Sequence, residues 1–252
     1  VLRVFDRPLD AAGPSINQAA ARILLVTGGP QKWIHTFKLP DIEEPRSFRV
    51  EAPAGATIAF DKVQYIGFSN YIAFGYRDRG DGGTRIYDDS GRLLHDLRGI
   101  GAGGHCAFSP DGKMAYFTFR PGQALELRLV KLDGTDDRLL WSCPDGDKKY
   151  VRNMHLNWAK NVSNWFTASF FAQEGVLPER YAPMLDEIMR VYTDGKTELL
   201  CRTGSACGKV FWAQPQQSMS RDGKRIQFNS NGKANVGELG SKPSGTIDRF
   251  IL

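Results

Sequence analysis

The feature that most constrains this chain is a short motif that occurs twice. Residues 105–118 read HCAFSPDGKMAYFT and residues 216–229 read QQSMSRDGKRIQFN, so a Ser-x-Asp-Gly core stands between two runs rich in apolar and aromatic residues. Such a core suits a type I turn, in which Ser or Asp bonds back to the backbone and Gly takes a positive φ. Each copy therefore predicts a strand, a tight turn and a second strand.

Weaker copies of the same pattern extend the repeat along the chain. The aligned residue before each turn is Ile16, Tyr65, Phe108, Trp158 or Met219, and these positions are 49, 43, 50 and 61 residues apart. Periods of this length are typical of propeller blades. Most copies are followed by further alternating runs joined by Asp-Gly or Asp-Ser-Gly turns, which is the pattern of antiparallel hairpins.

The sequence therefore predicts an all-β fold, a β-propeller of four-stranded antiparallel blades, of which about five are visible. We expect one domain over residues 1–252, with any helix confined to 174–186. The last repeat is short, and a strand within 1–6 can complete it; the alternative is that the chain is part of a larger ring. The repeats are expected near residues 13–50, 58–98, 103–142, 152–201 and 210–252.

Charge and hydropathy narrow the choice of partners. The net charge is +5, and the 33 Lys and Arg residues are scattered among 28 Asp and Glu residues. Scattered cations do not favour a nucleic-acid site, which needs them clustered on one face. No apolar run approaches the ~18 residues of a membrane span, so no transmembrane segment is expected.

The four cysteines do not decide whether the protein works in an oxidising or a reducing compartment. Cys201 and Cys207 flank a Gly-Ser turn and can close a short disulfide loop or remain buried thiols, and their spacing fits no zinc signature. A disulfide would imply an oxidising compartment. The chain begins with Val1 rather than Met, which we interpret as a processed or truncated form. The disulfide interpretation favours a periplasmic or secreted location.

One position of the repeat carries side chains that can bind a metal ion. The first strand of each blade lines the channel of a propeller, so equivalent positions converge on one mouth. His105, His155 and Gln216 each lie four residues before the aligned position of the turn. Imidazole nitrogens and an amide oxygen can bind a divalent metal, or the same groups can form structural hydrogen bonds. Lys62 and Arg152 are expected near this mouth, either to neutralise an acidic substrate or as solvated surface charges.

The tryptophans admit two interpretations. Trp158, Trp165 and Trp212 can bind sugars if their rings are exposed, but propeller sheets also pack face to face on large side chains. We assign them to core packing.

The Ser-Pro-Asp-Gly turn at 109–112 and its partial copy at 220–223 resemble the repeats of TolB-like and WD40-like β-propellers, and those of the oligogalacturonate lyases. The resemblance to the lyases implies a manganese-type ion held by His105, His155 and Gln216, because that family holds its ion with histidines and a glutamine at the channel.

Two classes of function follow. The first is a non-catalytic binding or scaffold module that requires no cofactor and docks a protein partner, or a small acidic or carbohydrate ligand, through its loops or channel mouth. The second is a metal-dependent polysaccharide lyase of the oligogalacturonate type, in which Lys62 or Arg152 assists β-elimination at a uronate. We favour the binding module because no complete catalytic set is recognisable and because propellers host many functions.

Overall fold

The computed structural model describes residues 15–16, 21–27, 32–51, 63–66, 69–76, 82–101, 106–118, 125–143, 151–172, 187–203, 214–230 and 248–251. For 15–16, 151–153, 171–172 and 248–251 only the backbone is described. All regular structure in these ranges is β, as the repeat predicts. The proposed closing strand within 1–6 and the segment 174–186 lie outside the described residues, so ring closure and the one-domain assignment stay predictions.

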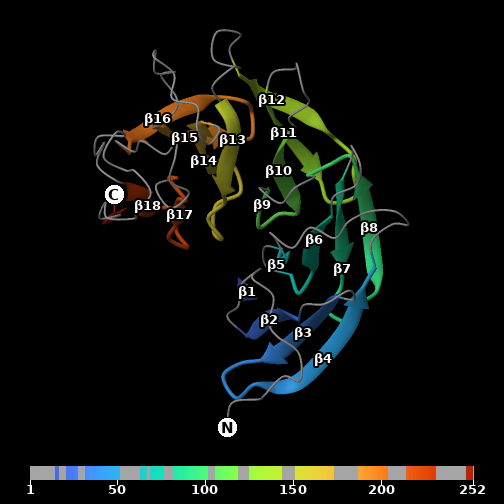
Figure 1. Cartoon of the computed structure of the whole chain (residues 1–252). Coiled ribbons are helices and arrows are strands. Elements are labelled where there is room, and N and C mark those ends of the chain that lie inside the picture. The colour runs from blue at the N-terminus through green and yellow to red at the C-terminus, as the bar shows by residue number, and fades with distance from the viewer. Residues whose placement is uncertain are drawn as a thin grey trace, which may run out of the picture. The chain divides into compact units, whose positions relative to one another are not determined.

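The described strands form five sheets, four with four strands and one with three, and in each sheet the strands follow one another in sequence (Figure 1). The first sheet contains β1 (Ser15–Ile16), β2 (Arg22–Thr27), β3 (Lys32–Lys38) and β4 (Glu43–Val50). The second contains β5 (Val63–Tyr65), β6 (Ile72–Tyr76), β7 (Gly83–Tyr87) and β8 (Leu93–Arg98). The third contains β9 (Ala107–Phe108), β10 (Lys113–Thr118), β11 (Glu126–Lys131) and β12 (Arg138–Ser142). The fourth contains β13 (Val151–Asn157), β14 (Trp165–Ala172), β15 (Glu187–Tyr192) and β16 (Thr197–Arg202). The last contains β17 (Ser218–Met219), β18 (Ile226–Ser230) and β19 (Asp248–Ile251).

The predicted turns are present in both copies of the motif. Lys113 N donates to Ser109 Oγ at 2.8 Å, and Gly112 has a φ of 83°. In the second copy, Gly223 has a φ of 71° and its N–H donates to Ser220 O at 2.9 Å. Only glycine adopts this backbone region without strain, so the motif fixes the hairpin geometry.

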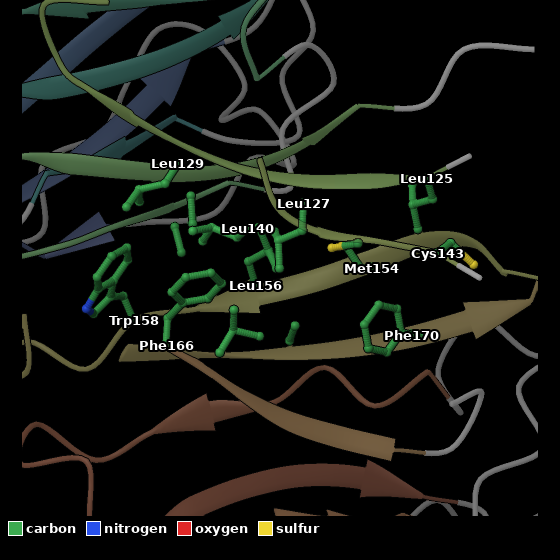
Figure 2. Packing of buried hydrophobic residues seen from close by; sticks show 14 residues of the cluster. Leu125, Leu127, Leu129, Leu140, Cys143, Met154, Leu156, Trp158, Phe166 and Phe170 are labelled. Atoms are coloured by element: carbon green, nitrogen blue, oxygen red, sulfur yellow. The ribbon is translucent and has the colours of Figure 1, made fainter. Parts of the chain in front are cut away.

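The contacts divide the chain into two compact units, and each has its own apolar core. The first unit comprises 1–104, 110–112 and 131–135, and the second comprises 105–109, 113–130 and 136–252. The core of the first unit comes from its two sheets: Leu24, Val26, Ile34, Phe48, Val50, Val63, Tyr65, Ile72, Phe74, Tyr76 and Tyr87. In the second unit, side chains from β9–β12 and from β13–β15 interleave between the two sheets, as Figure 2 shows for Leu127, Leu156, Phe166 and Phe170.

The structure confirms that Trp158 belongs to the packed core. Its side chain is buried, its ring lies 4.9 Å from that of Phe166, and its Nε1 donates to Val162 O at 2.6 Å. Trp165 is half-buried beneath the guanidinium of Arg190, which lies 4.5 Å from the ring centroid. Trp212 lies outside the described residues.

A tyrosine and an arginine share one carboxylate in the second sheet. Tyr76 Oη donates to Asp96 Oδ1 at 3.0 Å, and Arg85 Nη2 donates to Asp96 Oδ2 at 3.1 Å. Arg85 and Asp96 are direct cross-strand partners on β7 and β8. Burial, followed by the hydrogen bond to Asp96, raises the pKa of Tyr76 to about 12.

The second unit repeats this cluster. In the third sheet, Tyr116 Oη and Arg128 Nε both donate to Asp137 Oδ1, at 2.8 and 3.0 Å. Burial, followed by the hydrogen bond to Asp137, raises the pKa of Tyr116. In the fourth sheet, Arg190 and Glu198 are again direct cross-strand partners, and Arg190 Nη1 donates to Glu198 Oε2 at 3.0 Å. The cluster ties the third strand of these sheets to the fourth strand or the turn before it.

Candidate functional site

The predicted site residues fall into three groups. His155 lies on β13, and Gln216 lies in the segment that precedes β17. Arg152 belongs to β13, but its side chain is not described. Lys62 and His105 lie outside the described residues. The predicted convergence of His105, His155 and Gln216 therefore stays a prediction.

His155 is hydrogen-bonded to Gln214, a residue that the repeat does not single out. Its ring is half-buried, and its Nε2 lies 3.0 Å from Gln214 Oε1. Because an amide oxygen can only accept, the imidazole carries its proton on Nε2 in this arrangement. A metal ion at this nitrogen would require that proton to leave and Gln214 to move aside.

The backbone that follows Gln214 is locally compact. Gln216 N donates to Gln214 O at 2.7 Å, and Gln217 N donates to Pro215 O at 2.9 Å. These two consecutive bonds span only two residues each and compact the chain as γ-turns do. A count of residues back from the turn assumes extended strand, but β17 begins only at Ser218.

Gln217 is the buried polar centre of the junction between the last two sheets. Its side chain is 5% exposed. Its Oε1 accepts from Ser169 Oγ at 2.6 Å, and its Nε2 donates to His155 O at 2.7 Å. Ser169 Oγ also lies 2.7 Å from Pro215 O, which gives the hydroxyl a second acceptor. The repeat carries no signal for this residue beyond the run of glutamines in which it lies.

Asn157 adds a further hydrogen bond between the last two sheets. Asn157, the last residue of β13, accepts a hydrogen bond from Met219 N at 2.9 Å through its Oδ1. The segment before β17 is therefore fixed to β13 and β14 by hydrogen bonds as well as by apolar contacts. Buried networks in which each member is satisfied stabilise one arrangement of the chain.

Aspartate side chains fix the backbone of turns at one end of each of several sheets. Turns that follow the first and third strands of an antiparallel sheet lie at the same end of that sheet. In four of the described turns an aspartate Oδ1 accepts from the backbone N–H two residues later. These bonds are Ser90 N to Asp88 (3.0 Å), Thr135 N to Asp133 (2.9 Å), Lys196 N to Asp194 (3.0 Å) and Lys224 N to Asp222 (3.1 Å).

The same hydrogen bonds act on the ionisation of these aspartates. The pKa of Asp88, Asp133 and Asp222 is lowered chiefly by a hydroxyl of the same turn, and the pKa of Asp194 chiefly by the Lys196 N–H. The carboxylates are therefore charged and fixed at neutral pH, and they hold the turns in one conformation.

The described residues yield neither a metal cluster nor a membrane helix. No three His, Cys, Asp or Glu side chains within these ranges gather closely enough to hold a metal ion. Across the same ranges, no helix is long and apolar enough to span a bilayer. Cys201 forms no disulfide in the structure, which does not support the expected loop with Cys207, a residue outside these ranges.

Solved structures support the assignment of the fold. The chain matches TolB from Acinetobacter baumannii at 16% identity with a TM-score of 0.54, over 92% of this chain and 50% of that chain. It matches an oligogalacturonate lyase in complex with manganese at 13% identity and a TM-score of 0.56, over 86% of this chain and 61% of that chain. It also matches the β-propeller domain of the Trilobed protease from Pyrococcus furiosus at 14% identity and a TM-score of 0.55, over 97% and 68%.

The fold is therefore that of a β-propeller, with similarity to TolB. The chain spans half of the TolB chain and less than two thirds of the lyase chain. No protein-family model and no curated protein sequence matches the chain. Since propellers with different functions share this architecture, the fold alone assigns no activity.

Proposed function

We propose that this propeller is a non-catalytic binding module that docks a protein or small ligand through the turns at one end of its sheets. The observation that carries the proposal is the set of four locked turns, in each of which an aspartate fixes the backbone two residues later. Turns that are already ordered lose little conformational entropy when a partner binds to them. Turn side chains such as Arg92 and Lys196 are 76% and 81% exposed, so they are available for contact.

The environment of His155 also supports a binding module. Its Nε2 is engaged by Gln214 and its carbonyl by Gln217, which accounts for the residue as part of the junction between two sheets. A histidine that holds structure in this way needs no catalytic role to explain its place.

A metal-dependent lyase is the second candidate, and one observation favours it. An imidazole nitrogen and an amide oxygen, both of them metal-binding groups, lie 3.0 Å apart at His155 and Gln214. In this candidate His105, His155 and Gln216 would hold a manganese-type ion, and Lys62 and Arg152 would neutralise the carboxylate of a uronate substrate. The ion, when bound, would acidify the proton that β-elimination removes.

Site-specific photo-crosslinking in the producing cell tests the binding module. A photoreactive residue is placed at Arg92, Lys196 or Lys224 in the turns, and at Leu139 or Leu199 on the outer strands as controls. The control side chains are 50% and 47% exposed, so they are accessible as well. We expect a discrete adduct from at least one turn position and none from the outer strands. Adducts from the outer strands alone, or from no position, would overturn the proposal.

A further inference from the structure

Two turns of the second unit are locked together into one surface. Residues 158–164 join β13 to β14, and residues 220–225 join β17 to β18 (Figure 1). Asn161 N donates to Arg221 O at 3.0 Å across the two turns. A Cβ built on Gly223 would lie only 3.0 Å from side-chain atoms of both Val162 and Trp165, so the second turn packs closely on the first. We call this surface the basic turn pair.

The charge on the basic turn pair is strongly positive. Its cations are all exposed: Lys160, Arg221, Lys224 and Arg225. Asp222 is its one carboxylate, and it accepts from Ser220 Oγ at 2.6 Å and from Lys224 N at 3.1 Å. Four cations less one carboxylate give +3 on two turns, against +5 for the whole chain.

The cations of the two turns also act on one another. Partial removal of Lys160 from water, followed by the positive charge of Arg221, lowers the pKa of Lys160. Like charges held close together raise the free energy of the surface, and an anion that binds between them lowers it. The backbone bond between Asn161 and Arg221 joins the two turns directly.

We propose that the basic turn pair docks an acidic segment of a protein partner, an inference that rests on the proposed binding function and names its surface. A sugar ligand would need an open aromatic face, but the guanidinium of Arg190 lies 4.5 Å from the centroid of the Trp165 ring at this surface. A nucleic acid would need cations spread along several phosphates, whereas here they are concentrated in two turns. Aspartate and glutamate side chains on a short segment match the charge of this surface.

Fluorescence anisotropy with a labelled peptide of alternating Glu and Ser tests the inference. The matched probe carries Gln in place of each Glu. The double variant Lys160→Gln with Arg221→Gln removes two charges from the surface, and Arg49→Gln with Arg98→Gln removes the same charge from exposed side chains on the outer strands β4 and β8. We expect the Glu peptide alone to bind, and the first variant to weaken it about fivefold, as for two lost exposed charge pairs. The second variant should leave the affinity within about twofold, because its charges lie on outer strands and not in the turns.

Three results would overturn this docking surface. Equal weakening by both variants would show attraction to net charge alone. Tighter binding of an oligogalacturonate or a DNA duplex than of the Glu peptide would assign the surface to another kind of ligand. Absence of peptide binding, together with crosslinked adducts at Arg92 or Lys196, would also refute it while the proposed binding function stands. Circular dichroism of each variant establishes that the comparison is between folded proteins.

Discussion

Replacing Gln217 with methionine removes the polar centre of the junction between the last two sheets while nearly keeping its volume. The variant loses the hydrogen bond from Ser169 Oγ (2.6 Å) and the bond to His155 O (2.7 Å). Ser169 keeps Pro215 O as an acceptor at 2.7 Å, so its hydroxyl stays satisfied. The contact with Thr167 O, at 3.4 Å, is too long to add much.

The expected cost follows from these contacts. Each net hydrogen bond contributes about 1 kcal/mol, and a volume-conserving exchange adds little cavity cost. Gln217→Met should therefore lower the free energy of unfolding by about 1–2 kcal/mol. Urea unfolding followed by tryptophan fluorescence should show a lower midpoint with an unchanged slope.

Two controls make this prediction specific. Gln216→Met changes the neighbouring, half-buried side chain and should shift stability by less than about 0.5 kcal/mol. A double-mutant cycle of Gln217→Met with Ser169→Ala should show a coupling of about 0.5–1 kcal/mol, because the two residues share a bond. A Gln217→Met protein as stable as the wild type, with no coupling to Ser169, would refute the assignment of Gln217 as a bridge between the sheets.

Three further outcomes follow from the turns and the tyrosines. Gly223→Ala should destabilise by about 1–2 kcal/mol more than Gly99→Ala in thermal melts, because both glycines have a φ of +71° but only Gly223 has neighbours within 4 Å; equal effects would contradict the packing of the turn on Trp165. The raised pKa of Tyr76 (about 12) and of Tyr116 favours the neutral phenols in the folded state, so their contribution is complete below ~pH 10 and is lost as pH rises toward 12. An ultraviolet titration should therefore show late-ionising tyrosines that ionise together with unfolding, and the Tyr76→Phe protein should have one fewer. The four turn aspartates have lowered pKa values, so their contribution is present above ~pH 4 and lost as pH falls below it; melts between pH 3 and 7 that show no acid loss would contradict their role.

The repeat predicted the sheets because its signals are local. The turn motif, the alternation of apolar residues and the spacing of Phe108, Trp158 and Met219 all act within a hairpin or between equivalent hairpins. Turn geometry followed as well, since Gly112 and Gly223 have the positive φ that the motif requires.

The site was harder to predict because it depends on contacts between repeats. Gln214, which the repeat does not single out, lies 3.0 Å from His155, and no repeat period encodes the two short backbone bonds that follow Gln214. The basic turn pair likewise needs residues 158–164 and 220–225 to pack together, although they are far apart in the sequence. The cations of the basic turn pair are separated in the sequence, so their concentration on one surface could not be predicted from it.

The central claim, that this propeller binds rather than cleaves, is tested most directly with the substrate of the second candidate. Purified protein is incubated with oligogalacturonate and Mn²⁺, and the unsaturated uronate that β-elimination forms is followed by ultraviolet absorbance. We predict no product above the protein-free control. Product that forms steadily, disappears with EDTA and is lost in His155→Ala would contradict the claim and establish the lyase.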